Sequence, residues 1–349
     1  MASARSDLMA REVLAHYPAA AGFTGLIALG NRGGFSGARL WRVTAAGGDL
    51  CLRAWPADGP SPASLCTIHR LMKAARDAGL TFVPDVLPTR AGATWVEHAD
   101  RLWEVTTWMP GRADFHDHPA LVRLENVCTV LARLHRAWSS TAPRPGPCPG
   151  VQRRLARARE WTDLLRAGWQ PRLMAATGDP VLPWAERAWH LLRLRIQDVP
   201  RRLAPWTTRT VPLQPCLCDV WHDHILFDGQ HVSGLVDFGG VKMDHVAVDL
   251  ARLLGSLCPD DGEQWAAGLS AYRRLRPFSV DEEALTAALD ETGTLLGMAN
   301  WLRWLYRENR VFEERNVVAQ RLAQLVQRIE SWQSPAGGSS TLLFPKNTP

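Results

Sequence analysis

Two aspartates flank a predicted β-hairpin in the second half of the chain, and this arrangement constrains the fold more than any other part of the sequence. Ile225-Leu226-Phe227 is an apolar run that ends at Asp228-Gly229, a dipeptide that favours a tight turn. His231 to Phe238 reads as the return strand, because it is rich in β-branched and apolar residues. Asp219 lies in the loop that enters the first strand, and Asp237 lies at the end of the second. A tight hairpin therefore holds these two carboxylates near each other.

Bulk properties describe an ordinary globular protein. A chain of 349 residues is long enough for two lobes, because single hydrophobic cores usually stop growing below this length. The net charge of +5 comes without a block of like charges, so we expect no nucleic-acid partner. No segment approaches the ~18 apolar residues of a membrane span. We therefore expect a cytoplasmic protein with no membrane partner.

The seven cysteines are not spaced like those of a domain held together by disulfides. They are typical of small buried side chains in a reducing compartment. Cys216 and Cys218 alternate along a strand without a second cysteine pair, whereas closed zinc sites normally need four ligands. This pattern favours a structural role for both.

The first third of the chain is rich in short strands. Alternating or β-branched segments predict strands at 24–28, 39–44, 50–55, 82–87, 94–98 and 102–108, with helices at 7–17 and 60–79. The turn from Gly30 to Gly37 is rich in glycine, which lets backbone N–H groups approach a phosphate, although hairpins of this kind without a ligand are common. Met109-Pro110-Gly111 then interrupts the pattern. We predict a lobe boundary there.

The remainder of the chain is predicted to be mainly helical. Apolar residues recur at helical intervals in 121–138, 151–168, 183–198, 265–275, 280–305 and 311–332. In the first of these segments, the spacing favours a core position for His135 over a ligand role. The predicted organisation is an N-terminal lobe over residues 1–108, a helical lobe over 109–333 and a flexible tail over 334–349.

The order of these segments and the hairpin motifs resemble the aminoglycoside phosphotransferase family and its choline kinase and homoserine kinase relatives, over roughly residues 20 to 330. That family's loop aspartate corresponds to Asp219, and its loop asparagine, five positions later, corresponds to His224. Its second aspartate motif corresponds to Asp237-Phe238-Gly239, and its following helix motif to Asp249-Leu250-Ala251. The resemblance implies an α+β, two-lobed protein-kinase-like fold, with an antiparallel β-sheet N-lobe and a mainly helical C-lobe.

The resemblance also implies roles for particular residues in ATP-dependent phosphoryl transfer to a small molecule. Asp219 would orient or accept the proton of the attacking hydroxyl, and Asp237 would hold Mg²⁺. The nucleotide would lie between the lobes, under the glycine-rich turn and against the last strand of the first lobe. The nucleotide-binding residues implied in this way are Gly33, Gly34, Phe35, Ser36, Gly37, Arg53, Glu104, Thr106 and Trp108.

Three positions depart from the family pattern. His224 offers a nitrogen where Mg²⁺ prefers oxygen, so a second metal at His224 would be absent or better suited to Mn²⁺. Arg53 stands where the family has a phosphate-binding lysine, and the two side chains are not equivalent. The helix predicted at 60–79 lacks the glutamate that pairs with that lysine, and His69 lies at the border of its apolar face.

The phosphate acceptor is expected to be a small hydroxylated metabolite. Candidate walls of its pocket are Trp221, Asp223, Trp301 and Trp304, where the alternative for the tryptophans is core packing. Relatives in the resembled family act on aminoglycosides, amino alcohols, amino acids and sugars, and the sequence does not choose among them.

Two other functions stay open. A degenerate kinase fold that binds a nucleotide or a partner without turnover is favoured by Arg53 and His224. A metal-dependent hydrolase is suggested by His222-Asp223-His224, although hydrolases with such a motif usually place it at a barrel strand end and add ligands from later strands.

Overall fold

Five short strands near the N-terminus form one antiparallel sheet. They are β1 (Gly25–Gly30), β2 (Arg39–Ala45), β3 (Gly48–Ala54), β4 (Val96–His98) and β5 (Arg101–Thr107). Their spatial order is β1-β2-β3-β5-β4, so β5 pairs with β3 although a helix and β4 separate them along the chain. Arg53 of β3 lies opposite Glu104 of β5, which places the two side chains as neighbours on one face of the sheet.

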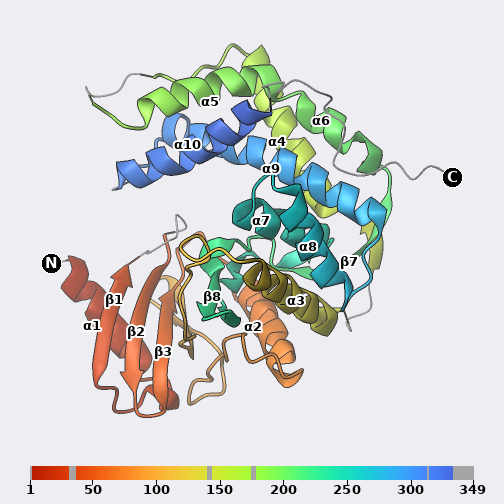
Figure 1. Ribbon diagram of the computed structural model, residues 1–349. Helices are drawn as coiled ribbons and strands as arrows, with labels where there is room; N and C mark the ends of the chain where they lie inside the picture. Colours follow the sequence, from red (N-terminus) through yellow and green to blue (C-terminus); the bar gives the residue numbers. More distant parts are fainter. Residues whose placement is uncertain (1, 31–36, 140–143, 174–177, 313, 333–349) are drawn as a thin grey trace. The chain divides into compact units, whose positions relative to one another are not determined.

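The computed structural model describes residues 2–30, 37–139, 144–173, 178–312 and 314–332 (Figure 1). Of the predicted nucleotide-binding residues, Gly33, Gly34, Phe35 and Ser36 lie outside this part of the chain, as does the predicted tail at 334–349. The chain divides into two compact units, one of residues 1–143, 214–242 and 253–278, the other of 144–213, 243–252 and 279–349. These units interleave along the chain, so they do not test the predicted lobe limits.

One face of the sheet is apolar and the other is polar, because side chains alternate along each strand. Helix α1 (Ala2–Leu14) packs on the apolar face, where its Leu14 is buried with Leu52 and Trp103. Their sequence neighbours Arg53 and Glu104 therefore point to the opposite face. The alternation in the sequence thus separates the core of the sheet from its charged side chains.

Helix α2 (Pro62–Asp77) begins and ends with the residues that local chemistry favours. The Ser61 hydroxyl accepts a hydrogen bond from the Ser64 N–H at 3.2 Å, and Pro62 occupies the first helical position. Gly79, with φ +78°, follows the last turn. Leu65, Ile68 and Met72 are buried on one side of the helix, and His69 is buried with them.

The strand predicted at 82–87 is wrong. Within this segment only Val86 pairs, through a single antiparallel bridge to Thr106. Pro84 and Pro88 cannot donate to a ladder, so a continuous strand is disfavoured. Phe82 is nevertheless buried, which explains why the segment is apolar.

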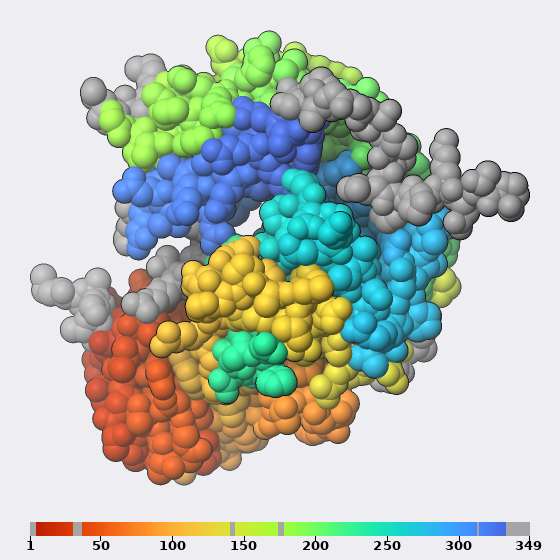
Figure 2. Space-filling model, in the orientation of Figure 1, coloured from red at the N-terminus to blue at the C-terminus, as the bar shows by residue number. Residues whose placement is uncertain are grey.

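The predicted hairpin is present. Its strands are β8 (Ile225–Asp228) and β9 (His231–Leu235), and Gly229 adopts φ +58° in the turn. Helix α3 (Leu121–Trp138) contacts β9, and the Asn126 side-chain amide donates to the Gln230 carbonyl at 3.0 Å. In Figure 2 the hairpin appears as a green patch beside yellow residues of this unit.

Helix α8 (Gly262–Arg273) packs against α3 in the same unit. The approach is close at Gly268, where a Cβ would lie 3.0 Å from Cys128 Sγ. His135 of α3 is fully buried, and its Nδ1 hydrogen bonds with the Tyr272 hydroxyl at 2.7 Å. The predicted core position of His135 is confirmed.

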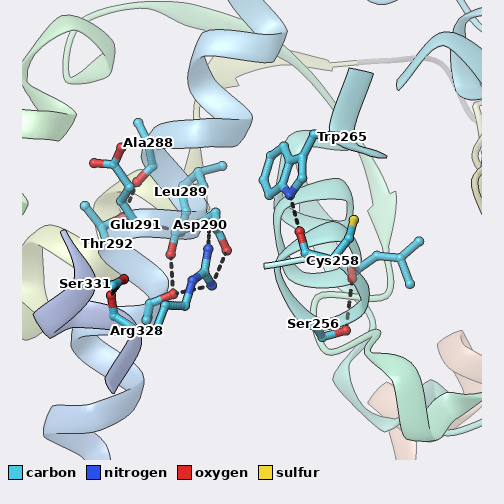
Figure 3. Close-up of polar contacts among 12 residues, drawn as sticks. Ser256, Cys258, Trp265, Ala288, Leu289, Asp290, Glu291, Thr292, Arg328 and Ser331 are labelled. Atoms are coloured by element: carbon cyan, nitrogen blue, oxygen red, sulfur yellow. Dashed lines mark hydrogen bonds and ion pairs between the residues drawn. The ribbon is translucent and has the colours of Figure 1, made fainter. Parts of the chain in front are cut away.

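The second unit is mainly helical. Its helices are α4 (Pro149–Arg166), α5 (Leu182–Arg195), α6 (Asp198–Leu203), α9 (Val280–Tyr306) and α10 (Arg315–Ser331). A capping box between Ser279 and Glu282 begins α9. Helix α10 packs on α5 and α9, and Arg328 forms an ion pair with Asp290 between α10 and α9 (Figure 3). The predicted helix at 183–198 ends earlier than expected, and α6 follows as a separate short helix.

The remaining elements are short. They are β6 (Arg144–Pro147), which pairs with β7 (Thr210–Cys216), then β10 (Lys242–Asp244) and α7 (Ala247–Leu257). Asp244 has no exposed surface; its Oδ1 accepts the N–H groups of Gly150 at 3.0 Å and His245 at 2.8 Å, and its Oδ2 pairs with Arg153. Within the described residues, no helix combines the length and the apolar character that crossing a bilayer requires.

Candidate active site

Asp237 follows the hairpin in a backbone conformation that residues other than glycine rarely adopt. Its φ is +62°, and its Oδ1 accepts a hydrogen bond from the Gly239 N–H at 3.3 Å, which begins the 3-10 turn η4 (Phe238–Gly240). The preceding Val236 N–H donates to the His224 carbonyl at 2.9 Å. A left-handed conformation costs on the order of 1–2 kcal/mol for such a residue and persists only where its surroundings hold it.

Arg53 holds the Asp237 carboxylate. Its Nη1 donates to Asp237 Oδ1 at 2.9 Å, and the side chains are 15% and 39% exposed respectively. Burial opposes the charged form of Asp237, but the Arg53 guanidinium outweighs this effect and lowers the pKa of Asp237 to about 2. Asp237 is therefore ionised at neutral pH, with one oxygen bound and a partly exposed side chain.

Two more side chains contact the Arg53 guanidinium, and a third contacts one of these two. The guanidinium lies over the Trp55 ring at 4.6 Å, and its Nε is 3.7 Å from Glu104 Oε1. Glu104 Oε2 is in turn 2.6 Å from His69 Nε2. Burial by itself lowers the pKa of Arg53, but Asp237 and Glu104 outweigh it and raise this pKa above its usual range. We refer to these five residues, Arg53, Trp55, His69, Glu104 and Asp237, as the Arg53 cluster.

Two glycines allow the turn η4 to approach its neighbours closely. A Cβ at Gly239 would lie 2.8 Å from Trp55 Cη2, and a Cβ at Gly240 would lie 2.6 Å from the Leu217 carbonyl oxygen and 3.0 Å from Asp219 Cβ. Only glycine fits at such distances without a shift of the Trp55 ring or of the backbone at Leu217. The approach at Gly240 brings the loop that carries Asp219 against the turn that follows Asp237.

Cys218, which precedes Asp219, also adopts a left-handed conformation, with φ +61°. The predicted alternation of Cys216 and Cys218 along one strand therefore fails, because β7 ends at Cys216. Cys216 is buried and Cys218 is half-buried, with no disulfide at either. The strained residue lies immediately before the carboxylate that the sequence assigns to the acceptor hydroxyl.

His224 is held by contacts at both ring nitrogens. It lies in the 3-10 turn η3 (His222–His224), where Nδ1 is 2.9 Å from the Asp219 carbonyl oxygen and must donate, because that oxygen only accepts. Nε2 accepts the Trp221 indole N–H at 2.8 Å and lies 3.7 Å from Asp237 Oδ2. His224 is thus near Asp237, as predicted, but its Nε2 lone pair is engaged by Trp221.

Trp221 and Asp223, two predicted substrate contacts, lie in the same loop. The Trp221 ring packs against His222 with centroids 4.6 Å apart, and His222 packs against His116 at 4.5 Å. Asp223 is partly exposed, and its Oδ1 is 3.4 Å from His222 Nε2. The His222 N–H donates to the Ser256 hydroxyl at 3.1 Å. These contacts fix the loop beside Asp219.

The other predicted nucleotide contacts are distributed over the sheet. Gly37 has φ +77° and lies close to Pro56. Thr106 pairs with Cys51 in the ladder between β5 and β3. The Trp108 N–H donates to the Asp49 carbonyl at 2.9 Å, and its ring lies under Arg42 at 5.0 Å. Of the predicted nucleotide-binding residues that the structure describes, Arg53 and Glu104 are the two in the Arg53 cluster.

Trp301 and Trp304 belong to α9 in the second unit. Their rings contact each other at 5.1 Å, and Trp301 also contacts Phe312 at 5.5 Å. Trp301 is buried, and Arg310 lies over the Trp304 ring at 5.0 Å. These contacts agree with the packing interpretation of the two tryptophans, and a substrate role stays a prediction.

Sequence reasoning missed the side-chain roles of Glu104, Trp55 and His69. The family resemblance implies that Glu104 contacts the nucleotide, whereas its side chain is buried between Arg53 and His69. The sequence shows His69 on a helix that lacks the expected glutamate, but it does not reveal that Glu104 is the partner of His69. The missing signal is the register between β3 and β5, which no local pattern of residues reveals.

The donor set fits one hard cation better than two. Asp237 offers ionised carboxylate oxygen, the ligand type that Mg²⁺ prefers. His224 offers nitrogen, and that nitrogen accepts a hydrogen bond from Trp221. For a nucleotide, the Arg53 guanidinium supplies a cation with several N–H donors on the polar face of the sheet. The residues present therefore fit a nucleotide phosphate with a metal at Asp237.

Comparisons with known proteins concern the family and the fold of the chain. A family model described as "Phosphotransferase enzyme family" matches residues 28–288, which is well over half of the chain. Homoserine kinase of Gluconobacter oxydans (strain 621H) is 29% identical over 214 residues, 57% of this chain and 58% of the relative. The chain thus spans less than two thirds of the length of this curated relative.

Two solved structures show the same fold at low sequence identity. An aminoglycoside phosphotransferase from Alicyclobacillus acidocaldarius has a TM-score of 0.59 at 19% identity, covering 92% of this chain and 93% of that one. A spectinomycin phosphotransferase in complex with ADP and spectinomycin has a TM-score of 0.65 at 10% identity, covering 94% and 98%. The predicted two-lobed α+β fold of the protein-kinase-like class is confirmed, and so is the resemblance from which it came.

Proposed function

We propose that this chain, which belongs to the phosphotransferase enzyme family, transfers the γ-phosphoryl group of ATP to a hydroxyl of a small molecule. The observation that carries the proposal is the Asp237 carboxylate. It is ionised, anchored at Oδ1 by Arg53, and partly exposed. A divalent cation bound there would neutralise charge on the phosphates, which is the main requirement of phosphoryl transfer.

Asp219 is proposed to act on the acceptor. Its loop lies against Gly240 and is fixed by the hydrogen bond from His224 Nδ1 to the Asp219 carbonyl. A carboxylate held beside the metal-binding segment is placed to orient the acceptor hydroxyl and to take its proton. His224 in this arrangement holds the loop, and metal binding by its Nε2 would require the Trp221 N–H to move away.

The acceptor is proposed to be a small polar molecule that carries a hydroxyl group. Trp221 and Asp223 lie in the loop with Asp219, and an indole ring beside a carboxylate suits a cationic amino group. The names of the related proteins supply two acceptors to test first, homoserine and spectinomycin.

Transfer is tested by following ADP release and product mass with ATP, Mg²⁺ or Mn²⁺, and a panel of hydroxylated amines and amino acids. The wild type is compared with Asp219→Asn and with Asp228→Asn, an exposed aspartate of the hairpin turn that serves as the matched control. We expect the Asp219 variant to lose on the order of 10³-fold in kcat, and the Asp228 variant to keep wild-type activity. Equal activity in all three proteins rejects the role of Asp219.

A nucleotide-binding protein without turnover is the second candidate. It is favoured by the direct bond from Arg53 to Asp237, which occupies one oxygen of the proposed metal ligand. Under this alternative, ADP or ATP raises the melting temperature, because a ligand that binds only the folded state stabilises it. No metal-dependent product then forms with any acceptor of the panel.

A further inference from the structure

Two buried members of the Arg53 cluster have no direct part in the proposed reaction. Glu104 is 7% exposed and His69 is 3% exposed. Glu104 Oε2 lies 2.6 Å from His69 Nε2, and its Oε1 faces Arg53 Nε at 3.7 Å. A buried carboxylate is retained only with close partners, and here both partners are side chains from other elements.

We propose that Glu104 and His69 are positioning residues that fix Arg53, and through Arg53 fix the orientation of Asp237. The inference rests on the proposed function for its kinetic consequence, but not for its structural one. It follows that the position of helix α2 determines the direction in which the second carboxylate oxygen of Asp237, Oδ2, points.

The register of the sheet supplies the first step. Arg53 and Glu104 are direct cross-strand partners in the antiparallel pair of β3 and β5, so their side chains leave the sheet side by side. An arginine side chain is long and has many rotamers. Glu104 on one side, the Trp55 ring on another and Asp237 at Nη1 leave its guanidinium a single orientation.

His69 supplies the second step, because contacts at both ring nitrogens fix its orientation. A carboxylate oxygen accepts, so Nε2 carries the hydrogen that it donates to Glu104, while Nδ1 lies 2.7 Å from the Thr94 hydroxyl. The ring stands on the buried side of α2 with Leu65 and Met72. A shift of α2 would therefore pull the ring from Glu104.

The last step links the cluster to the turn η4. Asp237 Oδ1 accepts hydrogen bonds from both Arg53 Nη1 and the Gly239 N–H, so the same oxygen joins the guanidinium to the backbone of the turn. Displacement of the guanidinium would weaken the hydrogen bond from the Gly239 N–H to this oxygen. The exchange of the Gly239 amide hydrogen is therefore a readout that needs no substrate.

The test compares five variants with the wild type. Glu104→Gln keeps the shape and removes the charge, His69→Leu removes both ring contacts, and His69→Gln restores a donor to Glu104. Tyr272→Phe removes a buried hydrogen bond elsewhere in the same unit and is the control for a general loss of stability. Thr94→Val removes only the hydrogen bond at Nδ1 of His69. It takes the place of Glu104→Gln or His69→Leu if either of those variants does not fold.

We expect Glu104→Gln and His69→Leu to lower kcat by 10- to 100-fold, the usual range for residues that orient a ligand group, with the KM of the acceptor within about twofold. His69→Gln should recover to within about threefold of the wild type. Thr94→Val should lower kcat by about threefold. In Glu104→Gln and His69→Leu, amide exchange of the peptide around Gly239 should be at least about tenfold faster than in Tyr272→Phe.

Unchanged exchange around Gly239 in Glu104→Gln and His69→Leu, with stability losses like that of Tyr272→Phe, would overturn the inference and leave the cluster a structural ion pair. Faster exchange with no transfer by the wild type to any acceptor would instead support the inference while rejecting the proposed function. If amide exchange around Gly239 becomes faster in these variants while kcat is unchanged and the wild type is active, the proposed effect of Glu104 and His69 on the function of Asp237 is rejected.

Discussion

Asp237 and Asp244 lie seven positions apart and are held in opposite ways. Asp244 has no exposed surface, and two backbone N–H groups, from Gly150 and His245, donate to one of its oxygens while Arg153 pairs with the other. Asp237 has a 39% exposed side chain, a positive φ, and a single guanidinium as its charged anchor in the cluster.

The contrast separates a carboxylate that stabilises the fold from one that is placed to act. A carboxylate bound at both oxygens by backbone and arginine has little capacity left for a ligand. A carboxylate bound mainly at one oxygen, with a low pKa, is ionised and keeps the other edge for a cation. The two aspartates should therefore respond differently to the same substitution.

The largest expected effect is on activity in Asp237→Asn. An amide binds a divalent cation far less well than a carboxylate, so we expect kcat to fall by on the order of 10³-fold. The free energy of unfolding should change by only about 1 kcal/mol, because the carboxylate is partly exposed. Steady-state kinetics and urea denaturation measure the two quantities. A comparable loss of activity in Asp244→Asn, at equal folded fraction, would break the contrast.

Asp244→Asn should instead act on stability. Removing one partner of a buried ion pair costs on the order of 3 kcal/mol, because the remaining charged and N–H groups are left unsatisfied. Urea denaturation should show this loss, while kcat per folded molecule stays near the wild-type value. A stability change below that of Asp237→Asn would contradict the prediction.

The pH dependence of stability should sharpen the difference. The folded-state pKa of Asp237, about 2, lies below the unfolded value, so its contribution is complete above about pH 5 and is lost as the pH falls towards 2. Lowering the pKa of a carboxyl group from its unfolded value to about 2 corresponds to about 2.5 kcal/mol of stability, and solvent screening of a partly exposed pair reduces this to about 1 kcal/mol. The difference in unfolding free energy between wild type and Asp237→Asn should therefore shrink on acidification. A constant difference from pH 7 to pH 3 would argue against the Arg53 pair as its source.

The smallest expected effect concerns Cys218. Glycine tolerates φ +61° without strain, but it also gains entropy in the unfolded chain, so Cys218→Gly should stabilise the fold by only about 0.5 kcal/mol. Cys218→Ala removes the same thiol and keeps the Cβ, which makes it the matched control. Thermal denaturation of the two variants isolates the backbone contribution. A Gly variant no more stable than the Ala variant would show that the loop is not strained.

The sequence predicts the hairpin, the two aspartates and most helices, because these depend on local patterns such as Asp228-Gly229 and helical periodicity. It also places Arg53 in the strand that faces the site. It does not predict the partners of Glu104, because the pairing of β3 with β5 sets Glu104 beside Arg53, about 50 positions away, and His69 contacts it from α2, a separate element. Nor does it predict the positive φ of Cys218, a residue type without a preference for that region.

The alternation in β3 has a consequence for how the length of this chain can vary. Leu52 belongs to the core with α1, and the next residue, Arg53, belongs to the cluster. An insertion or deletion of one residue within β3 would turn the guanidinium into that apolar core and a leucine towards Asp237. Related chains should therefore tolerate insertions in the turn at Ala45–Gly48 but not between Leu50 and Ala54. The number of residues in this strand is thus fixed by the site.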